Sequence, residues 1–263
     1  MKTLYALAFV SAIIPALGVL PASAASNRTW VSGTGADTGT CPITTPCASF
    51  SYALSQTASG GEIDCLGPGD FSNNGVGVTI SQAVSIICDG VSNGGILNIG
   101  SGGAVTVSAG SGAVVYLSGL DLNGGGVGGS GVFVDSGSTV YIVHCTIRGF
   151  NGPGVPIYST TNPTRVLIKD SIITNNTYGV YVQGESGAVN AAIVVNTLID
   201  GNSNSAVGAS GATGTSIIAL EQAALTGSPT GLDLTNGATG ELIGPSNAIA
   251  GAIIGTTTSV AFK

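Results

Sequence analysis

The stretch VLIKDSIITNN at residues 166–176 recurs as AIVVNTLIDGN at residues 192–202, a shift of 26 residues. The same shift carries the pattern forward onto IIALEQAALTGS (217–228) and back onto VYIVHCTIRGF (140–150), and a shift of 25 residues reaches VVYLSGLDLNG (114–124). A fixed period of this length is typical of repeat architectures, in which each repeat packs on its neighbours. We therefore expect a solenoid with one copy of the pattern in each coil.

Within each repeat the apolar residues alternate, slip by one position and alternate again. Val166 and Ile168 are followed by Ser171 and Ile173, so two strands with a two-residue bend would point both inner faces the same way. A third alternating run follows a connection rich in glycine or asparagine, and parallel stacking of the three runs would bury a continuous core. One inward column is expected to contain Leu122, Ile147, Ile173, Ile199, Leu225 and Ile249.

This strand-bend-strand repeat resembles the right-handed parallel β-helix of the pectate-lyase-like superfamily over residues 60–251. The opening CPITTPC (41–47), the following short helical stretch and GGEIDCLGPGDF (60–71) are similar to secreted, functionally uncharacterised right-handed β-helix repeat proteins. The resemblance implies an all-β fold: a single-stranded right-handed parallel β-helix with about 25–26 residues per coil and a short N-terminal capping helix. The right hand follows from the resemblance and from the general rule for parallel crossovers.

The N-terminal residues 1–24 are typical of a secretory signal peptide. Lys2 precedes an apolar run that ends in PASA, a small-residue cleavage pattern. A membrane anchor is the weaker alternative because the run is short and Pro15 interrupts it. We therefore expect export to an extracellular or periplasmic location, with no membrane span after signal removal.

Both ends of the predicted solenoid have their own expected structure. Residues 25–59 should form an N-terminal cap, in which a short amphipathic helix carries Phe50 and Leu54 and is closed by Gly60 and Gly61. Residues 252–263 should form a C-terminal tail. The open end of a solenoid exposes core and strand edges, which is why a cap is expected.

The cysteine spacing predicts two disulfides in an exported chain. Cys65 and Cys88 are 23 residues apart, close to one coil, so stacking would bring them within disulfide range. Cys41 and Cys47 would close the loop before the cap. Zinc binding is the weaker alternative because neither pair has close ligand spacing and the chain has one histidine.

Charged residues make up 7% of the chain, and the formal net charge is −7. Basic patches for nucleic acid or acidic membrane surfaces are therefore not expected. His144 and Cys145 are adjacent, but the repeat places His144 in a polar column at the bend and Cys145 in a small inward slot. A buried, unreactive thiol is expected there instead of a catalytic pair.

Enzymes of this fold need converging acids or calcium with a basic residue. The third outward column is read as Asp135, Pro156, Tyr181, Val207 and Asp233, which holds no adjacent acids. The weak catalytic candidates are Arg165, Lys169 and Asp170, clustered in RVLIKD (165–170). No cofactor is expected; calcium enters under the lyase alternative alone.

Two outward columns are apolar where a bare solenoid would be polar. The outward strip comprises Tyr141, Leu167, Ile172, Ile193 and Leu198. Three explanations compete: the C-terminal tail covers the strip, a second copy binds it to form a homo-oligomer, or it contacts a surface or ligand. A sugar-binding platform is ranked lower because aromatic side chains are few.

The repeat surface favours a structural, adhesion or carbohydrate-binding role, with a polysaccharide or cell-surface ligand and no recognisable catalytic site. The alternative is a polysaccharide lyase or glycoside hydrolase acting on a lateral groove. Whether the chain is an enzyme stays open, with a non-enzymatic role favoured, since adhesion requires a face whereas catalysis requires acids from adjacent coils to converge.

Overall fold

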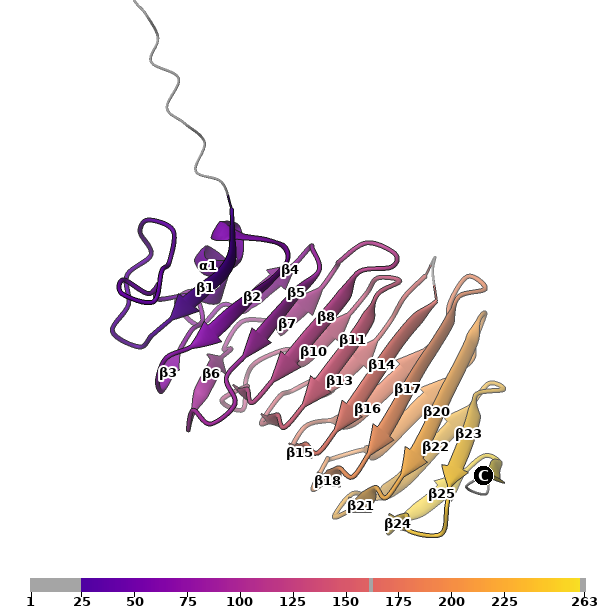
Figure 1. Ribbon diagram of the computed structural model, residues 1–263. Helices are drawn as coiled ribbons and strands as arrows, with labels where there is room; N and C mark the ends of the chain where they lie inside the picture. Colours follow the sequence, from indigo (N-terminus) through magenta and orange to yellow (C-terminus); the bar gives the residue numbers. More distant parts are fainter. Residues whose placement is uncertain (1–24, 161–162, 261–263) are drawn as a thin grey trace, which may run out of the picture.

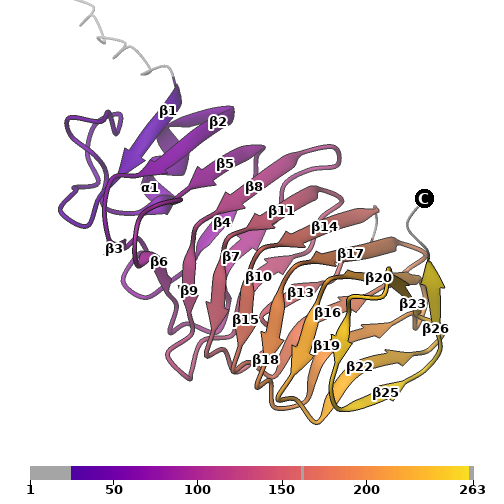
Figure 2. The same cartoon turned by 60° about the horizontal axis from the view of Figure 1, so that its bottom comes forward.

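The computed structural model describes residues 25–160 and 163–260, and it is a right-handed parallel β-solenoid. The chain winds through three sheets in turn, and the coils stack along one axis (Figures 1 and 2). All 23 strand pairings between named strands are parallel, and neighbours in a sheet come from successive coils. The predicted fold class is confirmed.

The first sheet contains the longest strands. Their length follows from the alternating runs that begin each repeat, such as TRVLIK in β14. In spatial order its strands are β1 (Ser26–Val31), β2 (Thr57–Cys65), β5 (Val84–Ile87), β8 (Val114–Ser118), β11 (Thr139–Val143), β14 (Thr164–Lys169), β17 (Val189–Val195), β20 (Thr215–Glu221), β23 (Thr239–Ile243) and β26 (Thr257–Val260).

The second sheet follows the first after a short bend in the central coils. Its strands are β3 (Gly69–Asp70), β6 (Gly94–Leu97), β9 (Asp121–Asn123), β12 (Thr146–Arg148), β15 (Ile172–Thr174), β18 (Leu198–Asp200), β21 (Ala224–Thr226) and β24 (Ala248–Ile249). The predicted inward column lies along this sheet: Ile147 pairs with Leu122 and Ile173, and the ladder continues to Ile249.

The third sheet completes each coil and leads back to the first. Its strands are β4 (Val78–Ile80), β7 (Gly103–Val107), β10 (Ser130–Val134), β13 (Val155–Ile157), β16 (Tyr178–Gln183), β19 (Ser205–Ser210), β22 (Thr230–Thr235) and β25 (Ala252–Ile254). Here the expected outward column is wrong at two positions. Phe133 occupies the register position expected for Asp135, which is exposed directly after β10, and Gly208 takes the place of Val207, which is buried.

The N-terminal cap contains helix α1 (Phe50–Gln56). Ser49 caps it by accepting a hydrogen bond from the Tyr52 N–H, and Phe50 packs edge-on against Phe71 at 5.0 Å between ring centroids. The expected closure by Gly60 and Gly61 is wrong, because α1 ends at Gln56 and both glycines lie in β2. The chain enters the first sheet directly from the helix.

The C-terminal tail is also organised differently from the expectation. Residues 252–260 form β25 and β26, which continue the third and first sheets by pairing with β22 and β23. The last coil therefore extends the solenoid and does not fold back over the outward strip. The expected signal peptide, residues 1–24, and the last three residues lie outside the described residues.

Both expected disulfides are present. Cys41–Cys47 closes the loop before α1 with 5.1 Å between Cα atoms, and Cys65–Cys88 joins neighbouring coils with 4.8 Å between Cα atoms. The fifth cysteine, Cys145, is a buried free thiol. Stacking of successive coils provides the separation that the inter-coil bridge requires.

Candidate functional site

Four aromatic rings from three chain segments meet on the outer side of the third sheet. We call them the aromatic row: Phe133 on β10, Tyr158 directly after β13, and Tyr178 and Tyr181 on β16. The Tyr158 ring lies between two others, with centroid distances of 5.7 Å to Phe133 and 5.8 Å to Tyr181. Tyr178 lies 5.0 Å from Tyr181. The contacts are edge-to-face or tilted, which is the preferred geometry of aromatic pairs.

The backbone ladder explains why these rings can lie close to the sheet. Pro156 pairs with Tyr181 on the outer side and is buried, although no strand covers that face. Gly208 follows Tyr181 in the next coil, and a Cβ atom there would lie 2.9 Å from Cδ2 of Tyr181. A side chain at this position would therefore push the ring away from the sheet.

Two tyrosine hydroxyls of the row, those of Tyr158 and Tyr181, have raised pKa values. Burial raises the pKa of Tyr158 to about 12, with further contributions from Tyr181, Tyr178 and the negative charge of Glu185. Burial also raises the pKa of Tyr181, as do Tyr178 and Asp233. The phenols of Tyr158 and Tyr181 therefore stay protonated at physiological pH and can donate a hydrogen bond.

Polar side chains border the aromatic row. The Nδ2 of Asn204 donates a hydrogen bond of 2.6 Å to the Tyr178 hydroxyl oxygen. Asp233 follows Gly208 in the ladder, and its Oδ1 is buried without a hydrogen-bond partner among the described residues. The aromatic row therefore presents apolar ring surface bordered by polar groups.

Sequence reasoning ranked an aromatic platform low because the chain has few aromatic residues. In the structure four of these few residues gather on one face. The alternation in GVYVQ (179–183) correctly places Tyr181 in the outward column, but Tyr158 and Tyr178 lie at strand ends, where alternation carries little information.

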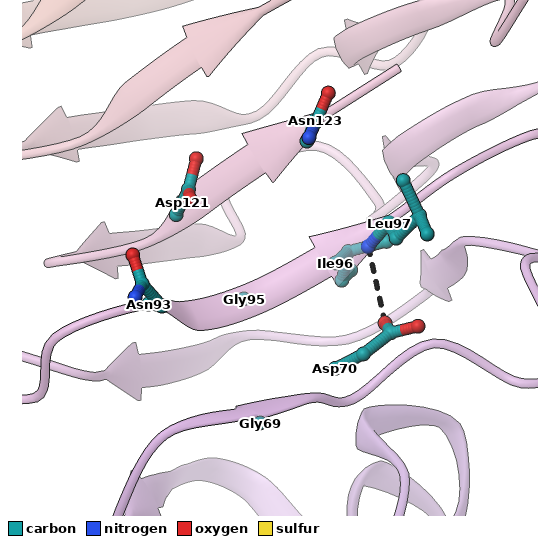
Figure 3. A pocket seen from close by; sticks show the side chains of 8 residues that line it. All are labelled: Gly69, Asp70, Asn93, Gly95, Ile96, Leu97, Asp121 and Asn123. Atoms are coloured by element: carbon teal, nitrogen blue, oxygen red, sulfur yellow. Dashed lines mark hydrogen bonds between the residues drawn. The ribbon is translucent and has the colours of Figure 1, made fainter. Parts of the chain in front are cut away.

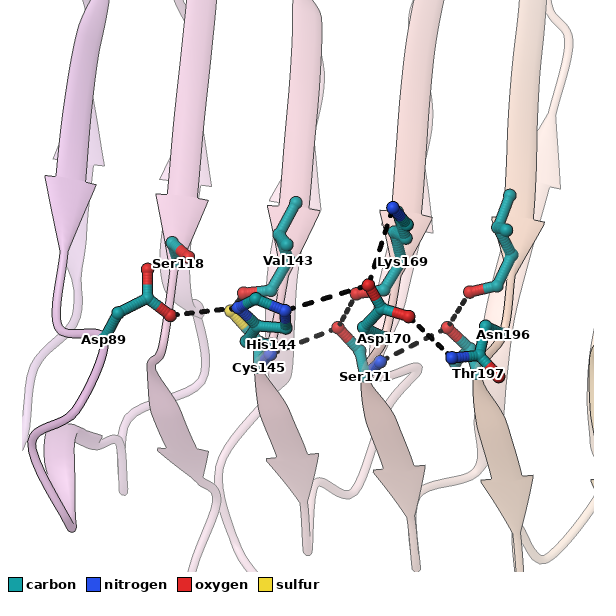
Figure 4. A network of polar contacts seen from close by, with 11 residues as sticks. Asp89, Ser118, Val143, His144, Cys145, Lys169, Asp170, Ser171, Asn196 and Thr197 are labelled. Atoms are coloured by element: carbon teal, nitrogen blue, oxygen red, sulfur yellow. Dashed lines mark hydrogen bonds and ion pairs between the residues drawn. The ribbon is translucent and has the colours of Figure 1, made fainter.

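A second group of polar residues follows the bends between the first and second sheets (Figure 4). We call it the bend row. The Nδ1 of His144 lies 3.1 Å from Oδ1 of Asp89, and its Nε2 lies 3.7 Å from Oδ2 of Asp170. Asn196 donates to Asp170 at 2.6 Å, and the Lys169 ammonium lies 3.6 Å from that carboxylate. The Asn196 hydrogen bond in particular lowers the pKa of Asp170, with help from Lys169 and His144.

The structure brings together two of the three catalytic candidates. Lys169 and Asp170 form an ion pair, whereas Arg165 lies four residues away on the same strand, about 13 Å along β14. No ion pair joins Arg165 to an acid within the described chain. The three residues therefore do not converge on one point, and their assignment as catalytic groups stays a prediction.

Cys145 lies beside the bend row but points into the core. Its Sγ contacts the Val143 carbonyl oxygen at 3.2 Å, and burial raises the pKa of the thiol to about 12. A buried thiol with a raised pKa is a poor nucleophile. His144 is exposed on the opposite side of the chain, so the two residues do not form a nucleophile–base pair.

A shallow depression lies on the second sheet across β3, β6 and β9 (Figure 3). Asp70 on its floor accepts a hydrogen bond of 3.0 Å from the Leu97 N–H. Asp121 is held by the Arg148 guanidinium at 2.8 Å. Both carboxylates already have protein donors, so the depression presents no free acid pair for catalysis.

The outward strip remains exposed in the chain. Ile172, Ile193 and Leu198 are 45%, 40% and 38% exposed, and the described C-terminal coil does not cover them. Covering by the tail is therefore wrong. Self-association through the strip stays a prediction, which Leu167→Lys combined with Leu198→Lys would test.

The described residues lack two features that would indicate a metal site or a membrane span. They contain no group of three or more histidine, cysteine, aspartate or glutamate side chains arranged to hold a metal ion. They also contain no helix with the length and apolar character needed to cross a membrane.

The comparison with protein families agrees with the architecture. A family model described as right handed beta helix region matches residues 70–222. Among solved structures, the crystal structure of pectate lyase Pel9A is similar over 91% of this chain and 78% of that one, with 13% identity and a TM-score of 0.46. No curated protein matches the chain.

Proposed function

Because the chain belongs to the right-handed β-helix family, whose stacked coils present long regular faces, we propose that it binds a polysaccharide on the outer side of its third sheet. The observation that carries this proposal is the aromatic row. Sugar rings have apolar C–H faces and polar hydroxyl edges. They can therefore pack on the rings of Tyr158 and Tyr181 while hydroxyls contact the neighbouring polar groups.

The coil spacing supports a polymeric ligand. Successive strands of a sheet lie about 4.8 Å apart, a length similar to one pyranose ring. A glycan that runs along the solenoid axis would therefore meet a new coil with almost every sugar. The aromatic row spans the coils of β10, β13 and β16, so it could contact several consecutive sugars.

Binding without cleavage fits the placement of the ionisable residues. Lys169 and Asp170 lie at the bend between the first and second sheets, whereas the aromatic row lies on the third. A glycan bound to the aromatic row would not reach that ion pair. Glycoside hydrolysis needs two carboxyl groups on either side of one bond, about 5–10 Å apart.

We place this binding role outside the cytoplasm. The signal-like N-terminal sequence supports export, and the two disulfides support an oxidising compartment. The ligand would then be an extracellular or cell-surface polysaccharide.

The test compares Tyr181→Ala with Tyr141→Ala by affinity electrophoresis through gels that contain soluble polysaccharides. Tyr141 is a matched control, because it pairs with another tyrosine ring on the first sheet, 5.9 Å from Tyr116. We expect Tyr181→Ala to weaken retention about fivefold, since one aromatic contact contributes roughly 1 kcal/mol beyond its buried area. Tyr141→Ala should retain wild-type affinity.

Two results would contradict the proposal. One is a lack of retention by every polysaccharide tested. The other is an equal loss of affinity in both variants, which would place the binding face elsewhere. Newly formed sugar ends in the same samples would show that the protein cleaves its ligand and would favour the lyase or hydrolase alternative.

A further inference from the structure

We infer that the aromatic row prefers glycans without carboxylate groups and that Asp233 is a residue that determines this preference; the inference rests on the proposed function. Asp233 lies on β22, two strands from Tyr181 in the same outward column. The aromatic row thus ends at a carboxylate. A polysaccharide that follows the column along the solenoid would pass this charge.

No basic residue on the third sheet balances the acids around the aromatic row. The described lysine and arginine residues are Arg28 on β1, Arg148 on β12, and Arg165 and Lys169 on β14, all in the first or second sheet. The single histidine, His144, lies at the bend on the other side of the coil. A bound uronic acid would therefore find no cation on this sheet.

The negative charges act directly on the aromatic row. Asp233 contributes to the raised pKa of Tyr181, and Glu185 contributes to that of Tyr158, so each carboxylate disfavours a second negative charge at the ring beside it. The buried Oδ1 of Asp233 has no hydrogen-bond partner among the described residues that would disperse its charge. The carboxylate of a polyuronate would meet the same repulsion, whereas a neutral sugar would not.

The experiment measures retention of the purified chain by pairs of polymers that differ in charge. The probes are polygalacturonate with its methyl-esterified form, and a mixed-linkage β-glucan with the same glucan oxidised to the carboxylate at C6. At low ionic strength we expect each neutral polymer to bind at least about tenfold more tightly than its carboxylated partner. Added salt should narrow the difference because it screens the repulsion.

Asp233→Asn keeps the shape of the side chain and removes its charge. We expect this variant to reduce the ratio of the affinities for neutral and carboxylated polymers several-fold. Glu221→Gln removes one negative charge from β20 in the first sheet and is the matched control, which should leave the ratio unchanged. Circular dichroism spectra identical to wild type would show that both variants are folded.

The outcomes separate the two proposals. Tyr181-dependent retention of a carboxylated polymer as strong as that of its neutral partner would overturn the charge preference and leave the binding function intact. If Asp233→Asn leaves the ratio of the affinities for neutral and carboxylated polymers unchanged, the role of Asp233 is overturned. Retention of none of the four polymers, or retention that Tyr181→Ala does not weaken, would remove the binding function and this inference together.

Discussion

The slot at Cys145 accepts a small side chain that can donate to the carbonyl two residues earlier. In the next two coils the equivalent hydroxyls make this hydrogen bond: Ser171 Oγ donates to the Lys169 carbonyl oxygen at 2.8 Å, and Thr197 Oγ1 donates to the Val195 carbonyl oxygen at 2.8 Å. They replace the contact between the Cys145 thiol and the Val143 carbonyl oxygen. We therefore expect Cys145→Ser to change the free energy of unfolding by less than about 1.5 kcal/mol, the net contribution of one hydrogen bond. Urea unfolding at pH 7 measures this difference.

Because of the same thiol, we expect the free energy of unfolding to fall at alkaline pH. The pKa of Cys145 is raised from 9.0 to about 12, so the unfolded chain releases the proton more readily than the folded chain. Stability is complete below pH 9 and falls as the pH approaches 12, by about 1.4 kcal/mol at pH 10. Cys145→Ser removes this contribution while leaving the tyrosines unchanged. If the free energy of unfolding depends on pH in the same way in the wild type and in Cys145→Ser, Cys145 does not titrate as stated.

The position of Cys145 could be predicted from the sequence because it occupies one slot in a repeat with constant length. The neighbouring coils fill that slot with Ser171, Thr197 and Ala223, all small. The catalytic candidates were harder to judge. Sequence proximity grouped Arg165 with Lys169 and Asp170, but the extended strand β14 separates Arg165 from Lys169, four positions later, by about 13 Å.

At the scale of the elements, the bends between the first and second sheets share one strained backbone conformation. His144, Asp170, Asn196 and Gln222 have φ angles of 53°, 50°, 45° and 52°. Asparagine and aspartate tolerate this left-handed region, whereas a long side chain such as glutamine does so at a cost. Asp170 and Asn196 also bond to each other, which stabilises their bends.

Gln222 is therefore the bend position at which glycine should stabilise the fold. We expect Gln222→Gly to raise the free energy of unfolding by about 0.5–1 kcal/mol, because glycine adopts this conformation without steric cost. Asn196→Gly should show no such gain, since it loses the hydrogen bond to Asp170. Chemical unfolding of both variants tests the pair. A less stable Gln222→Gly would mean that the glutamine side chain supports its bend.

The strand register predicted from the sequence is correct for the first two sheets and partly wrong for the third. The bend between the first two sheets has constant length in the central coils, so apolar periodicity alone aligns those strands. The connection into the third sheet varies in length: six residues separate Arg148 from Val155, but only three separate Thr174 from Tyr178. Alignment by repeat length then misplaces Asp135 and Val207, so it misses the outward position of Phe133.

At the scale of the whole molecule, the two ends of the solenoid differ. The N-terminal end has α1, β1 and both disulfides, whereas the last coil exposes Ile253, Ile254 and Val260 at 50%, 46% and 43%. Because coils contact mainly their neighbours, stability should vary along the axis. The cap was predictable from a helical pattern next to cysteines. The final coil was not, since β24 and β25 are too short for alternation to identify.

The Cys65–Cys88 disulfide provides a test of this local coupling. Closing a loop of 23 residues stabilises a chain by about 3 kcal/mol in the loop-entropy model, and this bridge joins β2 to the coil that follows β5. We expect Cys65→Ala with Cys88→Ala to speed amide exchange in β2, β5 and α1, while β17 and β20 keep wild-type protection. Hydrogen exchange measured by mass spectrometry resolves these segments, and Cys41→Ala with Cys47→Ala should affect the cap loop alone.

Glycan retention should survive the loss of the inter-coil bridge, because the aromatic row lies on later coils whose neighbours are unchanged. Equal acceleration in β20 and β2 would show instead that the solenoid unfolds as a single cooperative unit.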